Sequence, residues 1–346
     1  MARAAGSAGT WGAGGTAARR YHEVLWYVRR VAKNRTPAAE PESPRVSRAG
    51  TVAIVGRPNV GKSTFLNAAL GVNLAIVSRT PQTTRQNLLG VVHRTLEDGT
   101  AAELRLLDTP GLHKGTRALD KRMNRSARGA ATEADVVLFF TDLPTNPKGE
   151  LSPHPGDVTL LSDIGRGRTT VMVVNKIDRL KDKRALLPLL GKLGELADFA
   201  AIVPISALQA SGVERVLDAV APLLPEGEAA FGPDDLTDKP TRFFAAEFVR
   251  EQILRSTHEE VPHGVAVTVD SFEQKKGGFR VAATIHVDRE THKKIVVGAG
   301  GQMLKRIGTA ARKRLEELVG ASVFLELFVR NTPGWRADAR LRPELG

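Results

Sequence analysis

The segment IVGRPNVGKST, residues 54–64, limits most strongly what this chain can fold into. Gly56 and Gly61 are separated by four residues, and Lys62 and Ser63 follow, which is the spacing of a phosphate-binding loop. The apolar run TVAIV before the loop predicts a buried strand, and STFLNAAL after it predicts a helix. A glycine-rich turn that binds nothing would not need this order of strand, loop and helix. The segment therefore predicts an open α/β domain that binds a polyphosphate.

The residues of this loop have distinct roles in such a site. Glycines let the backbone wrap closely around phosphate oxygens, while loop N–H groups and the positive end of the helix attract them. We expect Lys62 to reach the β- and γ-phosphates and Ser63 to bind Mg²⁺. The nucleotide-binding residues predicted from this loop are Gly56, Arg57, Pro58, Asn59, Val60, Gly61, Lys62, Ser63 and Thr64.

Three further segments, each at the end of an apolar run, indicate a guanine nucleotide. LRLLDTPG places Asp108 where it would hold Mg²⁺, and Gly111 where its N–H would contact the γ-phosphate. VVNKID ends in Asp178, whose carboxylate can accept hydrogen bonds from guanine N1–H and N2–H₂, a donor pair that adenine lacks. VPISAL would bring a backbone N–H close to guanine O6. These segments add Thr109, Pro110, Leu112, Asn175, Lys176, Ser206, Ala207 and Leu208 to the predicted binding residues.

Residues 50–226 alternate between strand and helix patterns. The predicted strands lie in TVAIVG, NLLGVVHRTL, AELRLLD, ADVVLFFTD, TVMVVN and AAIVPIS. Such an alternation is typical of an α/β fold with a mostly parallel sheet and helices on both faces. Its ligand is expected at the carboxyl ends of the strands, where the motifs above are placed.

A second domain is expected after residues 227–241, a Pro-, Gly- and Asp-rich stretch that we interpret as a linker. Residues 242–330 predict the order α-β-β-α-α-β, with a hairpin through KKGG and a tail at 331–346. Between the last two helices lies a Gly-x-x-Gly turn of the kind that KH domains use to hold about four nucleotides. A glycine pair that only caps a helix is the alternative. The expected RNA-binding residues are Lys293, Lys294, Gly298, Ala299, Gly300, Gly301, Lys305, Arg306 and Arg312, with Lys313 beside them.

Composition narrows the functional classes. The 346 residues include 50 Lys and Arg against 38 Asp and Glu, a net charge of +12 that favours a polyanionic partner. The absence of cysteine excludes disulfides, thiolate catalysis and a zinc ribbon. No apolar run reaches the roughly 18 residues that a membrane-spanning helix needs.

Residues 1–48 form a basic extension rich in Ala, Gly, Arg and Pro. The stretch RYHEVLWYVRRVAKNR is compatible with one short amphipathic basic helix, while the proline-rich TPAAEPESPR that follows predicts disorder. We interpret the extension as a tail, or as the product of a start codon set too far upstream. An organellar transit peptide is the alternative, because the segment is rich in Arg and poor in acids.

From about residue 50 to 343 the chain resembles the Era family of bacterial ribosome-assembly GTPases, in the TrmE-Era-EngA-like superfamily. The resemblance lies in GRPNVGKSTFLN, SRTPQTTRQ, DTPGLHK, NKID, SAL, EVPHGVAV, IVVGAGGQMLKRIGTAARKRLEELVG, VFLELFVR and PGWR. It implies an Era-type GTPase domain and a type II KH domain, with GTP, GDP and Mg²⁺ as ligands. It also implies binding to the 3′ end of 16S ribosomal RNA and assistance in 30S subunit assembly. A cytoplasmic monomer with a peripheral membrane fraction and no DNA partner is expected.

Two positions depart from the family pattern. Ala299 stands where the family usually has a lysine in the Gly-x-x-Gly turn, and RNTPGWR stands where VKPxWR is usual. Both changes remove a basic residue, so we expect weaker RNA binding than is usual in the family.

Hydrolysis needs a group other than the glutamine of Ras-like enzymes, because Leu112 takes the place of that glutamine. In related GTPases an asparagine at the position of Asn59 helps to hold K⁺ against the phosphates; an asparagine that only shapes a turn is the alternative. We expect Thr84 to bind Mg²⁺ and the Thr83 backbone to contact K⁺. His113 is expected to be a surface residue of the second switch. The predicted catalytic residues are Asn59, Lys62, Thr84 and Gly111.

Two other functional classes remain open. In the first, the KH-like domain binds RNA weakly and docks a protein or the membrane surface. An exposed apolar patch would favour this class, and a basic groove beside Gly298 would favour RNA. In the second, the chain is a tandem GTPase of the Der type, which would need a second phosphate-binding loop that the sequence lacks. Asn175 and Asp178 argue against ATP as the nucleotide.

Overall fold

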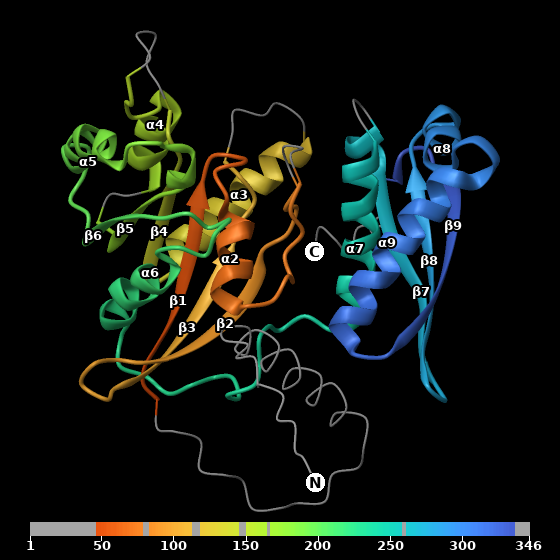
Figure 1. The fold of residues 1–346 in the computed structure, drawn as a ribbon, viewed down its shortest axis with the longest axis horizontal. Helices are drawn as coiled ribbons and strands as arrows, with labels where there is room; N and C mark the ends of the chain where they lie inside the picture. Colours follow the sequence, from red (N-terminus) through yellow and green to blue (C-terminus); the bar gives the residue numbers. More distant parts are fainter. Residues whose placement is uncertain are drawn as a thin grey trace, which may run out of the picture.

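The computed structural model describes residues 46–78, 83–112, 118–144, 150–164, 167–257 and 261–335. The N-terminal extension up to residue 45, His113, and the tail from 336 onward lie outside the described residues. The described chain forms two domains that lie side by side (Figure 1). Among the described helices, none is long and apolar enough to cross a membrane.

The first domain is built on a single large sheet. Its strands are β1 (Val46–Gly56), β2 (Leu88–Thr95), β3 (Ala101–Asp108), β4 (Val136–Thr141), β5 (Thr170–Val174) and β6 (Ala201–Pro204). In the described residues this sheet has the order β2-β3-β1-β4-β5-β6, and only β2 runs antiparallel to its neighbour. Every residue of β4 and β5 is buried, as is usual for parallel strands covered on both faces. The predicted mostly parallel sheet is confirmed.

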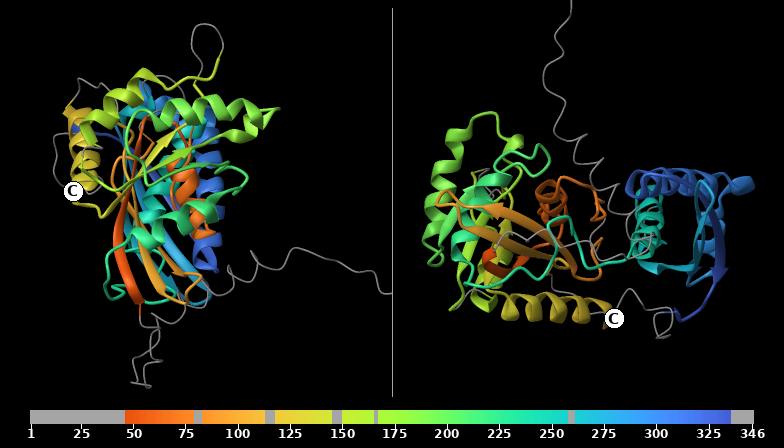
Figure 2. Two further views of the ribbon diagram at one scale, coloured as in Figure 1. Left: turned by 90° about the vertical axis from the view of Figure 1, so that its left-hand side faces the viewer. Right: turned by 90° about the horizontal axis from the view of Figure 1, so that it is seen from below.

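Helices cover both faces of this sheet (Figure 2). They are α2 (Lys62–Leu70), α3 (Ala118–Glu133), α4 (Pro155–Ile164), α5 (Leu186–Gly194) and α6 (Val213–Val220). Val52 and Ile54 of β1 belong to the core that contains α2 and α6 residues, whereas Ala53 and Val55 belong to the core that contains α3, α4 and α5 residues. Successive side chains of a strand point to opposite faces, so one apolar run supplies two cores.

The second domain has the predicted order α-β-β-α-α-β. Its elements are α7 (Thr241–Ser256), β7 (Val265–Lys275), β8 (Gly278–Val287), α8 (Glu290–Val297), α9 (Gln302–Val319) and β9 (Ser322–Asn331). β7 pairs with β8 antiparallel, and β8 pairs with β9 parallel. Ile307, Ala311, Leu315 and Val319 recur every four residues along α9 and are buried in a core that also contains residues of α7 and of the sheet. This arrangement brings the glycine turn between α8 and α9 to one end of the domain.

The segment between the domains is packed rather than extended into solvent. Its Ala230 and Phe231 N–H groups donate to the buried carboxylate of Glu103, and Leu236 accepts a hydrogen bond from Val91 N–H at 2.9 Å. β1 begins at Val46, four residues before the expected start of the domain at 50. At the other end, Trp335 is buried and its Nε1 donates to the Gly264 carbonyl at 3.2 Å. The described part of the tail therefore packs on the second domain.

Candidate functional site

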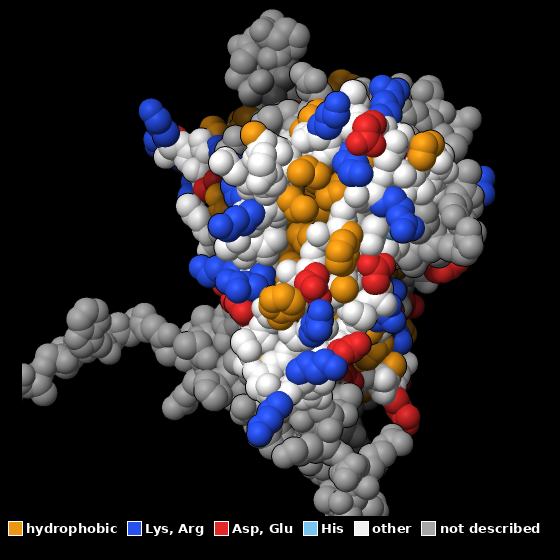
Figure 3. Space-filling model, turned by 90° about the vertical axis from the view of Figure 1, so that its right-hand side faces the viewer, with side chains coloured by type: hydrophobic (Ala, Val, Ile, Leu, Met, Phe, Trp, Pro, Cys, Tyr) orange, Lys and Arg blue, Asp and Glu red, His pale blue; other side chains and the backbone are white. Residues whose placement is uncertain are grey.

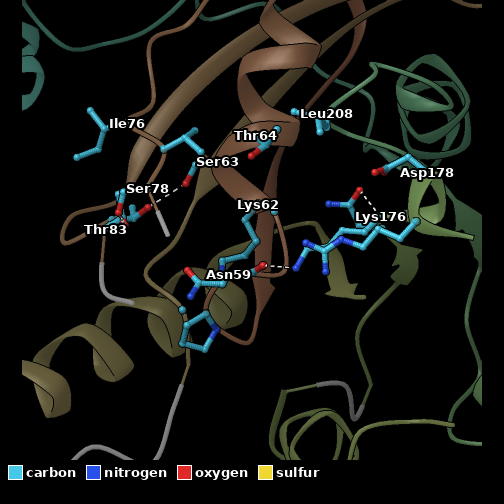
Figure 4. Close-up of a pocket in the computed structure, with 17 residues that line it drawn as sticks. Asn59, Lys62, Ser63, Thr64, Ile76, Ser78, Thr83, Lys176, Asp178 and Leu208 are labelled. Atoms are coloured by element: carbon cyan, nitrogen blue, oxygen red, sulfur yellow. Dashed lines mark hydrogen bonds between the residues drawn. The ribbon is translucent and has the colours of Figure 1, made fainter. Parts of the chain in front are cut away.

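The sequence motifs of the first domain meet around one cavity at the carboxyl ends of the parallel strands (Figure 4). The cavity has a volume of about 510 Å³. Of the residues predicted to bind nucleotide, those that line it are Pro58, Asn59, Gly61, Lys62, Ser63, Thr64, Gly111, Asn175, Lys176, Asp178 and Leu208; Thr83 and Thr84 also line it. Leu208 is 79% exposed at the rim. Segments more than 140 residues apart in the chain thus form one site, from Pro58 to Leu208.

The phosphate-binding loop lies close to the Asn175 side chain, which is possible because Gly61 has no side chain. Gly61 has φ of 101°, a left-handed conformation, and a Cβ there would lie 2.2 Å from Asn175 Nδ2. Lys62 Nζ donates to the carbonyls of Gly56 and Arg57 at 3.1 and 3.0 Å. The pKa of Lys62 is lowered to about 8, chiefly by burial; the Asp108 carboxylate opposes this shift and the Arg57 charge contributes to it. A polyphosphate would offer this buried ammonium stronger acceptors than the two carbonyls.

Three oxygen-bearing side chains converge below the loop. Ser63 Oγ lies 2.6 Å from Asp108 Oδ2 and 2.9 Å from Thr84 Oγ1, and Thr84 Oγ1 lies 3.4 Å from Asp108 Oδ2. Burial raises the pKa of Asp108 to about 6, against the opposing effects of Lys62, Ser63 and Thr84. Asp108 Oδ1 is buried and has no hydrogen-bond partner among the described residues. This set of hard oxygen donors, with one buried oxygen left over, fits a small divalent cation.

The base-recognition segments are held together by their own hydrogen bonds. Asn175 Nδ2 donates to the Val60 carbonyl at 2.8 Å, and Asn175 Oδ1 accepts from Ala207 N–H at 2.9 Å. Lys176 Nζ donates to the Asn59 carbonyl at 2.6 Å. Ser206 Oγ donates to Asp178 Oδ1 at 2.6 Å, which fixes the carboxylate, and its N–H donates to Ser211. The N–H groups of Ser206 and Ala207 that we expected near guanine O6 thus have partners inside the protein.

Several predicted residues lie behind the cavity instead of lining it. Leu112 is 2% exposed, and its N–H donates to the Gly56 carbonyl at 3.1 Å. Thr109 is buried and donates from Oγ1 to the Ile54 carbonyl at 2.7 Å. Because the Leu112 side chain is packed in the core, it cannot reach a water molecule at the nucleotide. The other predicted residues that do not line the cavity are Gly56, Arg57, Val60, Asp108, Pro110, Ser206 and Ala207.

Sequence analysis missed two carboxylates that hold Arg57 of the loop, one of which also binds the base-recognition segment. Asp142, directly after β4, accepts from Arg57 Nη2 at 2.8 Å and from Lys176 Nζ at 2.9 Å. Asp157 is fully buried and accepts from Arg57 Nε at 2.7 Å and from Thr141 Oγ1 at 2.7 Å. The position of Asp142 at a strand end was the available signal, but its two partners are distant in sequence.

We expect Asp142→Asn to weaken the binding of GTP and GDP equally, by about three- to tenfold. The reason is that Arg57 and Lys176 each lose a charged partner. Titration with a fluorescent guanine nucleotide measures this change. Preference for guanine over xanthine should stay unchanged, because Asp178 keeps its own partner, Ser206. A loss confined to GTP would contradict the bridging role of Asp142, since both nucleotides use the loop and the base segment.

The glycine turn of the second domain lies between two helices, as predicted. Gly298 ends α8 and Gly301 precedes α9, and Ala299 and Gly300 are exposed. Around the turn, Lys294, Lys305 and Arg306 are exposed and Lys293 is half-buried; farther along α9, Arg312 and Lys313 are exposed as well. Arg312 lies within 4.0 Å of Glu316, so its charge is partly offset. The turn therefore has two exposed central residues, and exposed cations lie on the two helices that flank it.

Comparison with known proteins decides the family. Residues 51–176 match the family described as 50S ribosome-binding GTPase, and residues 260–336 match the KH domain family. GTPase Era of Xylella fastidiosa (strain M12) is 44% identical over 290 residues, covering 83% of this chain and 93% of that protein. GTPase Era of Stenotrophomonas maltophilia (strain K279a) is 45% identical over 292 residues, covering 84% and 94%. The chain belongs to the Era family.

Solved Era structures agree with this assignment. An Aquifex aeolicus Era variant bound to GDP·AlF4⁻ has a TM-score of 0.77 and 37% identity, covering 86% of this chain and 97% of its own. Era in complex with MgGDPNP and nucleotides 1506–1542 of 16S ribosomal RNA has a TM-score of 0.76, with the same identity and coverage. This protein is therefore a GTPase that binds GTP and GDP. Its GTPase domain is followed by a KH domain.

Proposed function

We propose that this Era-family GTPase binds the 3′ end of 16S ribosomal RNA through its KH domain and assists 30S subunit assembly. The observation that carries the proposal is the Gly298–Gly301 turn between α8 and α9, whose two central residues are exposed and whose flanking helices carry exposed cations. Such a turn admits the sugar-phosphate backbone of a single strand closely. The related Era structure with 16S ribosomal RNA supports this choice of RNA.

Crosslinking in cells, followed by sequencing of the bound RNA, tests this function directly. We expect reads concentrated at the 3′ end of 16S ribosomal RNA. Crosslinks spread over unrelated RNAs would contradict the proposed specificity. Sedimentation of the same lysate should place part of the protein with the small ribosomal subunit and its precursors.

We infer that Mg²⁺ is held by Ser63, Thr84 and Asp108, the three side chains that converge below the loop. When bound, the ion would neutralise negative charge on the β- and γ-phosphates. Lys62 would hold the same phosphates from the loop, and the Gly111 N–H would contact the γ-phosphate. Because Leu112 is buried in the core, the attacking water must be oriented by another group.

We further propose that K⁺ completes the site beside Asn59, which lies at the cavity wall. Asn59 has φ of 62°, a left-handed conformation that asparagine tolerates, so it also shapes the loop. The Thr83 backbone, which we expect to contact K⁺, has its carbonyl held by a hydrogen bond from Arg250 Nη2 at 2.7 Å. Of these two groups, only the Asn59 side chain can be removed by substitution, so Asn59 carries the test of the K⁺ proposal.

Hydrolysis should be faster in KCl than in NaCl at equal ionic strength, by about tenfold or more, since a cation in this place replaces an arginine finger. Asn59→Gly should abolish the difference between the rates in KCl and NaCl. Glycine is chosen because it tolerates the left-handed backbone at this position, which an alanine would strain. Turnover assays in the two salts measure this effect. Equal rates in both salts for the parent protein would show that K⁺ has no part in hydrolysis.

A second candidate function is docking of a protein on the KH domain. Phe324 and Phe328 of β9 are 61% and 55% exposed on the sheet face that the helices do not cover. Figure 3 shows hydrophobic side chains gathered on this face, with Lys and Arg around them. Protein crosslinks without RNA crosslinks in the cell experiment would favour this candidate.

We also propose that the protein is located in the cytoplasm, with a fraction bound peripherally to the membrane. Separation of membranes from the lysate tests this location.

A further inference from the structure

The KH domain touches the segment of the GTPase domain that carries Thr83 and Thr84. Arg250 on α7 donates from Nη2 to the Thr83 carbonyl at 2.7 Å. Across the same boundary, Arg85 donates from Nη1 to the Val265 carbonyl at 2.8 Å. In Figure 1, α7 is the helix of the KH domain that faces α2 and the segment after it. Residues next to the proposed Mg²⁺ site thus contact the other domain.

The same helix holds a second point of this segment. Glu251, which is buried, accepts a hydrogen bond from Val77 N–H at 3.1 Å. Arg255 donates from Nη2 to the Val77 carbonyl at 3.2 Å and lies 3.0 Å from Glu251. The segment between α2 and β2 is therefore fixed to α7 at both Val77 and Thr83.

Arg250 is held so that its guanidinium has one orientation. It is 1% exposed, and it pairs with Glu247 through Nε at 2.8 Å and Nη2 at 2.6 Å. A bidentate pair with a carboxylate fixes the plane of a guanidinium. The donor that Arg250 offers to Thr83 is therefore set by the packing of the KH domain.

The contact with Thr83 bears directly on Thr84. The peptide bond between them is planar, so a partner on the Thr83 carbonyl also restricts the Thr84 N–H and backbone. Thr84 Oγ1 lies 2.9 Å from Ser63 Oγ and 3.4 Å from Asp108 Oδ2. Arg250 itself does not line the nucleotide cavity. Its influence on the site must therefore pass through Thr83.

We propose that Arg250 is a positioning residue for GTP hydrolysis, which holds Thr84 in the Mg²⁺ site from the KH domain. The inference rests on the proposed role of Thr84 as a Mg²⁺ ligand. A shift of α7 would withdraw the guanidinium from Thr83, so the placement of the KH domain sets how firmly Thr84 is held. Displacement of a catalytic group by about 1 Å can slow a reaction about a hundredfold.

Single-turnover hydrolysis by the full chain tests the proposal. We expect Arg250→Ala to slow the chemical step by about 10- to 100-fold and to raise the Mg²⁺ concentration needed for half the maximal rate. Affinity for GDP should change by less than about twofold, because GDP lacks the γ-phosphate that this segment closes on. Glu247→Gln, which keeps the side-chain shape but frees the guanidinium, should give a smaller loss of the same kind. It also decides the question if Arg250→Ala does not fold.

Two controls make the result specific. Arg242 is exposed on the same helix and donates to the Val269 carbonyl inside the KH domain, so Arg242→Ala should hydrolyse GTP at the parent rate. Thr84→Ala should be slow, and a parent rate for it would refute the proposed Mg²⁺ ligand itself. If Thr84→Ala is slow but Arg250→Ala and Glu247→Gln both match the parent in rate and Mg²⁺ dependence, the positioning role is wrong.

Discussion

Asp178→Asn should turn the nucleotide preference of this protein from guanine toward xanthine. The carboxylate of Asp178 can accept from both guanine N1–H and N2–H₂, whereas an amide keeps one acceptor and turns a donor toward N2–H₂. Loss of a charged hydrogen bond, together with two facing donors, should lower GTP affinity about a hundredfold or more. Xanthine has an oxygen in place of the N2 amine, and this oxygen can accept from the new amide. Xanthine nucleotides should therefore bind the variant more tightly than they bind the parent protein.

The structure gives this prediction a defined geometry and a matched control. Ser206 Oγ donates to Asp178 Oδ1 at 2.6 Å, and an asparagine oxygen can accept the same bond, so the side chain should keep its orientation. Asp182→Asn makes the same chemical change at an exposed carboxylate that pairs with Arg184, and it should leave both affinities unchanged. Competition titrations with GDP and xanthosine diphosphate measure the effect. Unchanged GDP affinity in Asp178→Asn would show that this carboxylate does not read the base.

Gly300→Asp should reduce the affinity for single-stranded RNA by about ten- to a hundredfold at low salt, because a carboxylate would face phosphate. Gly300 has φ of 55° and ψ of 23°, a region that Asp and Asn enter more readily than other side chains. A Cβ at this position would meet nothing within 4 Å. The turn should therefore keep its shape, and the loss should come from charge.

Gly300→Asn separates charge from shape, because it has the size of Asp and the same tolerance for this backbone. We expect it to bind RNA within about threefold of the parent, since it adds no charge. Fluorescence anisotropy of the full-length proteins with a short RNA from the 3′ end of 16S ribosomal RNA, across a salt series, measures both variants. If Gly300→Asp binds as tightly as the parent, the turn is only a connection between helices. An equal loss in Asn and Asp would point to shape instead.

The buried strands and the nucleotide motifs could be predicted because both are local patterns. TVMVV is buried at every position, so its apolar run predicts a buried strand without knowledge of the neighbouring strands. Parallel strands present their carboxyl ends at one edge, so motifs that follow β1, β5 and β6 had to meet there. The Gly-x-x-Gly turn could be predicted for a similar reason, since the helices on either side of it are adjacent in sequence.

Contacts between segments distant in sequence were decided only by the tertiary structure. Asp142 and Arg57 lie 85 residues apart, and nothing in the sequence near either shows that they pair. Arg250 and Thr83 lie 167 residues apart and in different domains. The apolar residues of α7 indicate that the helix packs against other elements. They do not show that Arg250 contacts the other domain. Sequence alone therefore determined the fold class and the kind of ligand, because these follow from local periodicity and short motifs. The orientation of Arg250 and its contact with the Thr83 carbonyl follow from packing between domains, which no local pattern records.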